Sequence, residues 1–499
     1  MTAGDVAIRP MSLETTLATV TLTRVVLTSA LAWTLVPALV HSAPPLDVVE
    51  SAMWGREWVI GTYKHPAMPA WLIELSRSLN GGAVGWPVYL ISQIFNATTL
   101  WLTFLLARDL SGERVGAVAV LSLLGVEYFS WRSFELNHTI AQLPFWVGAA
   151  LCAWRALQRD TLVWWVALGA VAAVGLYAKL SNAMMLITIA GWLLATPRGR
   201  AAILRPGPWI AALVFCLLGA GIVKWLLASD FAALAYAEGR GRTQTVWAKL
   251  LFPAGAVLQA LPVVLMLAAA GAFNRHGERF AVAVRPNTEA ERFLLVMAVA
   301  PPLLAIVSAL AGSAGLRVSW MAPALPLLAV LLASKIEPRL TDNVLERLHR
   351  LGAGVAVALP LIYLLLATSI GTFSNFEPLR VNWPQAEMAR ARAARWSQET
   401  GGKPLRIVAG SAWTAGLVGL NQPDRPSIMS AENPALSPWV TPERLKRDGA
   451  LVVWIHDDMA KRIGKLIEGR PISESRIAFP RGGKAGHELV VKYVVLPPE

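Results

Sequence analysis

The sequence predicts a polytopic, all-α membrane domain followed by a soluble α/β domain. Of the 499 residues, 55% are hydrophobic and 21 are Trp, and the mean hydropathy is +0.50. These values are typical of a chain that crosses a membrane many times. Apolar runs recur up to residue 371, and strand-like and helix-like patterns alternate after it. We therefore expect a transmembrane domain over 1–371 and an α/β domain over 372–499.

Eleven apolar runs approach the roughly 20 residues that a membrane-spanning helix needs. They lie at 22–40, 86–107, 115–131, 139–157, 162–178, 182–196, 207–228, 249–272, 292–311, 318–334 and 351–371. Loops rich in Lys and Arg follow alternate spans, at 108–114, 155–160, 197–205, 274–292 and 335–350. With eleven spans these loops share the side of the N-terminus, which the positive-inside rule makes cytoplasmic. We therefore interpret the net charge of +13 as an orientation signal and expect no nucleic-acid partner.

A long first loop, residues 44–85, and the α/β domain are expected on the opposite side of the membrane. A helix that starts at Leu46 would place Asp47 and Glu50 on one face, because they are three residues apart. We expect Gly61 to end this helix.

The second half of the loop should contain an extended turn and an interfacial helix. Tyr63, Lys64 and His65 stand before a proline, and the residue before a proline avoids the helical region. Pro69 can open the next helix. We expect this helix to direct Trp71, Leu72, Ile73 and Leu75 toward lipid.

The C-terminal part has the pattern of a small α/β domain. Residues 405–410, 450–457 and 488–496 are short apolar runs typical of buried strands. Thr441 is a good N-cap, since a proline follows it at the first helical position. The domain lacks a Gly-rich phosphate loop, so we expect it to cover a site in the membrane domain or to contact a substrate.

Four outer segments carry residues suited to the transfer of a group from a phosphate. They contribute Asp47, Glu50, Lys64 and His65; Glu135, Asn137 and His138; Lys179; and Arg240 with Arg242. A carboxylate can deprotonate an acceptor hydroxyl group, and cations can stabilise a phosphate leaving group. The set suits a membrane-anchored phosphate donor.

Each of these residues also has a simpler explanation. Glu135 or His138 could stabilise the start of the helix at 139–157. Lys179 could extend its side chain along lipid to reach the polar interface. Arg240 and Arg242 could contact lipid headgroups.

Metal ions and disulfides are weakly indicated. Asp47, Glu50 and His65 could together bind a divalent cation, but a flexible turn separates them, and this spacing favours no catalytic metal. Cys152 and Cys216 both fall in apolar runs, which excludes a disulfide framework.

Two motifs of the first outer loop, P-L-D-x-x-E at 45–50 and Y-K-H-P-A-x-P-A-W-L at 63–72, resemble glycosyltransferase family 39. This family includes the protein mannosyltransferases and the bacterial lipid A aminoarabinose transferase. The resemblance continues through Asn137-His138, Ala-Lys-Leu-Ser at 178–181, Arg-Val-Ser-Trp at 317–320 and Pro-Asp-Arg-Pro-Ser at 423–427. It is nearest to the rhizobial-type branch that adds sugars such as galacturonic acid to lipid A or lipopolysaccharide core.

The resemblance implies a GT-C fold and a sugar donor linked to polyprenyl phosphate. Asp47 would be the catalytic base, assisted by Glu50. The residues implied in donor-phosphate binding are Lys64, Lys179, Arg240 and Arg242. The other site candidates are Tyr63, His65, Glu135, Asn137 and His138. Many family members have Thr-Pro-Asp where this chain has Glu-Leu-Asn-His-Thr at 135–139, so Glu135 and Asn137-His138 remain alternatives for a second acidic position.

We therefore expect a glycosyltransferase of the bacterial inner membrane that acts on the periplasmic face. Its N-terminus would be cytoplasmic and its C-terminal domain periplasmic. The acceptor would be lipid A, lipopolysaccharide core or another envelope molecule, and no cofactor is expected. The alternatives are a protein O-glycosyltransferase of the same fold and a lipid-linked-sugar transporter. The lack of Asp or Glu deep in the predicted spans counts against an ion-driven transporter.

Overall fold

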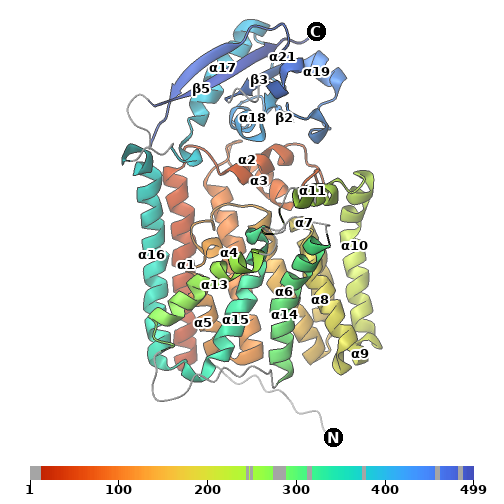
Figure 1. Ribbon diagram of the computed structural model, residues 1–499, viewed down its shortest axis with the longest axis vertical. Coiled ribbons are helices and arrows are strands. Elements are labelled where there is room, and N and C mark those ends of the chain that lie inside the picture. The colour runs from red at the N-terminus through yellow and green to blue at the C-terminus, as the bar shows by residue number, and fades with distance from the viewer. Residues whose placement is uncertain are drawn as a thin grey trace.

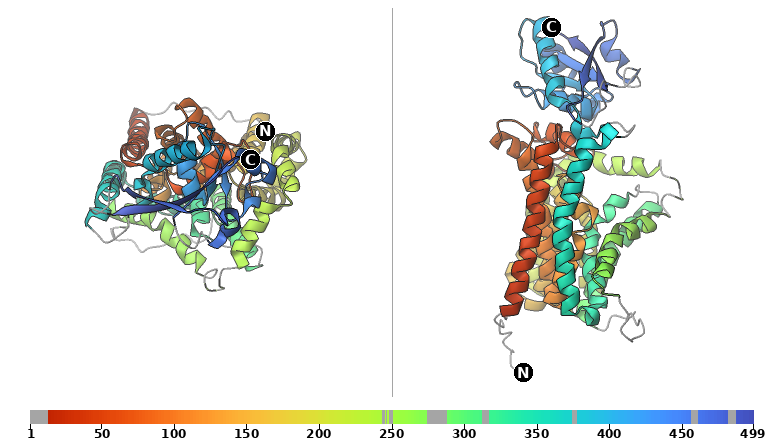
Figure 2. Two further views of the ribbon diagram at one scale, coloured as in Figure 1. Left: turned by 90° about the horizontal axis from the view of Figure 1, so that it is seen from above. Right: turned by 90° about the vertical axis from the view of Figure 1, so that its left-hand side faces the viewer.

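The protein is a bundle of long helices with a small α/β domain on one end (Figures 1 and 2). The computed structural model describes residues 13–242, 245, 247, 251–273, 288–311, 317–373, 378–455, 461–481 and 487–499. Helix α1 begins at the end of the bundle that lies farthest from the α/β domain.

Each of the eleven expected spans contains a helix, but the helix in the span expected at 115–131 ends at Leu123. These helices are α1 (Leu13–Val40), α4 (Trp86–Ser111), α5 (Glu113–Leu123), α6 (His138–Arg159), α7 (Leu162–Ala178), α8 (Asn182–Ala195), α10 (Pro206–Ala228), α13 (Phe252–Ala269), α14 (Glu289–Leu310), α15 (Leu325–Lys335), which continues the 3₁₀ segment η2 (Val318–Ala324), and α16 (Asp342–Phe373). Within the described residues, seven of these segments are long and apolar enough to cross a membrane. Helices α7 and α8 and part of α13 are apolar but shorter.

The remaining short elements connect the bundle or belong to the C-terminal domain. The helices are α2 (Leu46–Gly55), α3 (Met68–Leu79), α9 (Pro197–Ile203), α11 (Ala232–Arg242), α17 (Gln385–Thr400), α18 (Ala412–Gly419), α19 (Pro442–Asp448) and α21 (Gly464–Ile467). The further 3₁₀ turns are η1 (Glu127–Phe129), η3 (Glu337–Arg339), η4 (Arg380–Asn382) and η5 (Pro434–Leu436).

The first outer loop differs from its expected form in two respects. Helix α2 ends at Gly55 rather than at Gly61. Gly61 instead pairs with Pro66 in a tight hairpin, and a Cβ atom at Gly61 would lie 2.2 Å from the ring of Trp225. Ile73 does not face lipid, because it is completely buried in a core that α3 shares with the C-terminal domain.

The C-terminal domain contains a five-stranded mixed sheet. The strands are β1 (Ile407–Gly410), β2 (Ser427–Ser430), β3 (Ala450–Trp454), β4 (Ser473–Ala478) and β5 (Glu488–Leu496), in the order β2-β1-β3-β5-β4. β1 is parallel to β2 and β3, whereas β5 is antiparallel to β3 and β4. The three expected apolar strands are present. Two strands were not predicted from the sequence. β2 has only four residues, and the side chains of the edge strand β4 are at most half-buried.

The hydrophobic core of the sheet is continuous with the first outer loop. One buried cluster contains Val48 and Val49 of α2, Ile73 of α3, and Val408 and Leu451 of the sheet. Figure 1 shows α18 directly over α2 and α3. The two segments therefore pack as one unit, although more than 300 residues separate them in the sequence.

The two ends of the bundle should be labelled from opposite sides of the membrane. Arg350 at the basic end and Arg447 in the α/β domain have side chains that are 73% and 71% exposed. In a variant without native cysteines, we expect a membrane-impermeant thiol reagent to modify Arg447→Cys in right-side-out vesicles and Arg350→Cys only in inverted vesicles. Labelling of both positions from one side would contradict this orientation.

Candidate active site and donor cavity

A cavity of about 780 Å³ opens among α8, α11, α14 and η2. Most of its wall is apolar. The apolar lining comes from Trp146, Leu180, Met184, Phe231, Ala233, Leu234, Pro301, Pro302, Ala305, Met321 and Ala324. A cavity of this size and character can accept a lipid chain or a drug-sized ligand.

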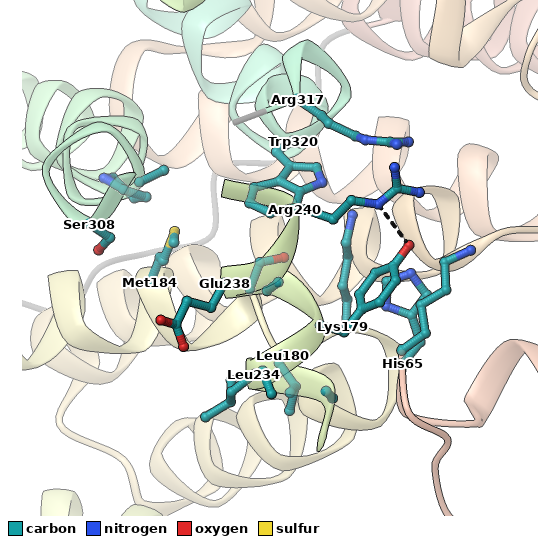
Figure 3. Close-up of a pocket in the computed structure, with 18 of the residues that line it drawn as sticks. His65, Lys179, Leu180, Met184, Leu234, Glu238, Arg240, Ser308, Arg317 and Trp320 are labelled. Atoms are coloured by element: carbon teal, nitrogen blue, oxygen red, sulfur yellow. Dashed lines mark hydrogen bonds between the residues drawn. The ribbon is translucent and has the colours of Figure 1, made fainter. Parts of the chain in front are cut away.

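Cationic side chains gather on one side of this cavity. Lys64, Lys179, Arg240 and Arg317 all line it. Figure 3 shows Lys179, Arg240 and Arg317 reaching into the same region beside Trp320 and His65, with Met184, Leu234 and Ser308 on the other side. The cavity is thus amphipathic, with a cationic region joined to an apolar one.

Lys179 is placed by the break between two helices. It stands in extended conformation after the end of α7, and its side chain is buried. Its Nζ atom donates to Thr139 Oγ1 at 3.1 Å and lies 6.0 Å from the centre of the Trp320 ring. Burial lowers the pKa of Lys179 to about 8, and the carboxylate of Asp47 opposes this shift.

Lys64 is positioned by the hairpin after α2. Its Nζ atom is 2.6 Å from Glu50 Oε2, and both side chains are largely buried. Burial raises the pKa of Glu50, and the positive charge of Lys64 opposes this rise. Glu50 therefore acts first as a partner that orients Lys64, and it does not line the cavity.

Arg240 comes from α11, which lies across the outer side of the cavity. Its Nε atom donates to the Tyr236 hydroxyl at 3.2 Å, and Tyr236 contacts the Tyr63 ring with centroids 5.7 Å apart. Burial and the negative charge of Glu50 raise the pKa of Tyr63, which keeps its hydroxyl protonated. Arg242 ends the same helix, but its side chain lies outside the described residues.

Asp47 lies beside the cavity rather than in its wall. It occupies the first turn of α2 and is half-buried. Asn137 Nδ2 lies 3.4 Å from Asp47 Oδ2 and donates a long hydrogen bond to it. Asn137 Oδ1 also accepts the backbone N–H groups of Thr139 and Ile140, so this residue caps α6. Asn137 thus connects the start of α6 to the carboxylate of Asp47.

Glu135 faces α2 and does not cap α6. Its carboxylate accepts a hydrogen bond from the backbone N–H of Asp47. Burial and the charge of Asp47 raise the pKa of Glu135 to about 7. Two carboxyl groups therefore meet at the start of α2, where backbone N–H groups favour negative charge.

Two histidines connect the hairpin to α6. The rings of His65 and His138 lie 4.1 Å apart, and His138 Nε2 donates to the Pro66 carbonyl at 3.0 Å. Burial lowers the pKa of His65 well below its usual value, so this ring is neutral. In the described part of the chain, no cluster of three His, Cys, Asp or Glu residues is arranged to bind a metal. Independence from a cofactor stays a prediction.

Arg317 is the main cavity residue that was not among the site residues predicted from the sequence. It lines the cavity, directly before η2. The available signal was its outer location, because a basic residue there works against the positive-inside rule. The same argument applies to Arg240.

Comparison with known proteins agrees with this architecture. Residues 64–225 match the model of the dolichyl-phosphate-mannose-protein mannosyltransferase family. The whole chain is similar in structure to ArnT from Cupriavidus metallidurans bound to undecaprenyl phosphate, with a TM-score of 0.64, 14% identity, and coverage of 94% of this chain and 97% of ArnT. No curated protein matches the sequence significantly.

More distant matches are two structures from Archaeoglobus fulgidus. One is the oligosaccharyltransferase in complex with Zn and sulfate, with a TM-score of 0.41, 13% identity, and coverage of 86% of this chain and 67% of that chain. The other is the oligosaccharyltransferase AglB with an inhibitory peptide and a dolichol-phosphate, with a TM-score of 0.38, 12% identity, and coverage of 89% and 70%.

The chain has the GT-C fold, and the family model matches about a third of it, residues 64–225. The expected GT-C fold is thereby confirmed. The rhizobial-type branch is not tested by these matches and stays a prediction.

The buried lysine predicts that affinity for a phosphate-containing lipid depends on pH. Lys179 is protonated below its pKa of about 8 and loses its charge above it. Because a phosphodiester remains anionic over this range, we expect affinity for polyprenyl phosphate-sugar to fall above pH 8, by at most about tenfold per pH unit. Lys179→Arg should remove most of this fall in affinity above pH 8, since arginine stays charged. Titration calorimetry in detergent can test this prediction. The same fall in affinity above pH 8 in the Lys179→Arg variant would contradict it.

Proposed function

We propose that this protein transfers a sugar from a polyprenyl-phosphate donor to lipid A or lipopolysaccharide core on the periplasmic face of the inner membrane. The observation that carries the proposal is the amphipathic cavity, whose cationic region lies next to the helix that bears Asp47. A membrane-anchored phosphate ester has the matching chemistry, with one anionic group on a long apolar chain.

The cavity suits both parts of such a donor. The apolar wall formed by Met184, Pro301 and Ala305 can contact the first isoprene units. Lys179 and Arg317 can bind the phosphate oxygens, and Lys64 can approach from the hairpin. The structural likeness to ArnT, whose structure contains undecaprenyl phosphate, supports this assignment of the cavity.

The reaction needs one displacement at the anomeric carbon. Asp47 accepts the proton of the acceptor hydroxyl, and the hydroxyl oxygen forms a bond to the anomeric carbon. The bond from this carbon to the phosphate oxygen breaks, and its electron pair leaves with the polyprenyl phosphate. Lys179 and Arg317 stabilise the negative charge that develops there. Glu135 and Asn137 orient Asp47 through its backbone and carboxylate.

The acceptor and the sugar are assigned from the sequence resemblance. The rhizobial-type branch suggests a uronic acid on lipid A or core. A protein hydroxyl could use the same base and leaving group, so a protein O-glycosyltransferase is the second candidate. The family model, which is named for protein mannosyltransferases, is the observation that favours it.

Loss of the carboxylate at residue 47 should stop transfer and spare donor binding. Asp47→Asn keeps the size of the side chain but cannot accept the proton, so we expect kcat to fall by about 10²–10⁴-fold. The donor affinity should change little, because Asp47 does not line the cavity. Glu468→Gln, an exposed change in the C-terminal domain, is the control.

Mass spectrometry of envelope lipids can test this variant in cells that lack the gene. Wild type should restore a lipid A or core species that is one sugar heavier, and Asp47→Asn should not. Near-normal transfer by Asp47→Asn would refute the proposed base. Unchanged lipids combined with a missing glycoprotein modification would favour the protein acceptor.

A further inference from the structure

The α/β domain contacts the membrane domain through the helix that carries Asp47. Helix α18 of this domain packs against α2. The contact is close at Gly416, where a Cβ atom would lie 2.3 Å from Val49 Cγ1. Val49 is completely buried and its branched side chain has little rotational freedom. A larger residue at 416 must therefore displace α2 or α18.

A second face of α2 is equally confined. A Cβ atom at Gly55 would lie 2.2 Å from the Ala70 carbonyl oxygen of α3. Helix α2 thus lies between α18 and α3, and it has close backbone contact with the latter. A shift of α18 cannot be absorbed without a movement of α2.

Charged groups connect α3 to the same C-terminal domain. Glu74 and Arg77 of α3 are each only 2% exposed. Arg77 donates to Glu74 Oε2 at 3.0 Å and to the Leu420 carbonyl at 3.2 Å, and Glu74 also pairs with Arg425. Burial of such charges is costly unless they are paired, so these ion pairs favour one relative placement of the two segments.

Arg425 itself has a strained backbone. Its φ of +50° lies in the left-handed region, which non-glycine residues rarely adopt. Its carbonyl accepts a hydrogen bond from Arg56 Nε at 2.8 Å, directly after α2, and its side chain pairs with Glu74. Strain of this kind persists where surrounding contacts determine the conformation, and it is concentrated at functional sites.

We propose that the C-terminal α/β domain positions the catalytic base: α18 and Arg425 determine where α2 places Asp47 relative to the donor cavity. This inference rests on the proposed function, because it assigns a task to the domain within the same transfer reaction. The contacts of Gly416 and Arg425 act through α2 and α3, and neither residue lines the cavity.

The Gly416→Ala variant should therefore slow sugar transfer without weakening donor binding. The added methyl group displaces α2, so we expect kcat to fall by about tenfold. The dissociation constant for polyprenyl phosphate should stay within about twofold, since Lys179 and Arg317 are not on α2. The double variant Val49→Ala/Gly416→Ala removes the clash and should recover kcat. Gly464→Ala is the control, because a Cβ atom at residue 464 of the same domain meets nothing within 4 Å.

Arg425→Met provides a second, independent test, in case Gly416→Ala does not fold. It removes the ion pair to Glu74 and should lower kcat without weakening polyprenyl phosphate binding, while Arg425→Lys should recover part of the rate. Equal kcat values in wild type, Gly416→Ala and Arg425→Met would overturn this inference but leave the proposed function standing. Equal losses of kcat and phosphate affinity would also overturn it, because they would indicate general damage. A folded wild type that binds no polyprenyl phosphate and forms no product would instead overturn the proposed function.

Discussion

The buried ammonium group of Lys179 is the feature on which the donor cavity depends. Its side chain is only 7% exposed, and a charged group in such a place is stable only with polar or charged partners. Thr139 and the face of Trp320 supply part of this stabilisation, and Asp47 attracts the charge from farther away. A phosphate group would complete it, and Arg317 and Arg240 make the same cavity still more favourable for an anion.

The hairpin after α2 connects this cation to the carboxylates. It is fixed to α10 by the contact of Gly61 with Trp225 and to α6 by the hydrogen bond between His138 and the Pro66 carbonyl. Lys64 projects from it into the cavity and binds Glu50 on α2. Lys64 is therefore coupled to the acid-bearing helix, whereas Lys179 and Arg317 are held by other elements, after α7 and before η2.

The sequence was sufficient to predict features that depend on local chemistry. Apolar runs located the helices, and the residues before Pro66 were correctly expected to leave the helical conformation. Features that depend on distant partners could not be predicted. Ile73 looked like a lipid-facing residue because nothing near it in the sequence indicates that the C-terminal domain covers α3. Glu135 looked like a cap for α6, but Asn137 has this role, and Glu135 instead accepts a hydrogen bond from the start of α2.

The placement of Glu135 also bears on which carboxylate can act as the base. Glu135 and Asp47 meet at the N-terminus of α2, and the charge of Asp47 is one of the causes that raise the pKa of Glu135 to about 7. Near neutral pH, a substantial fraction of Glu135 is therefore protonated. Two carboxylates at such close range disfavour double ionisation, and Lys179 attracts the charge toward the donor cavity. Asp47, the carboxylate that acts on Lys179, is thus the better candidate for the proposed base, and Glu135 accepts a hydrogen bond from the start of α2.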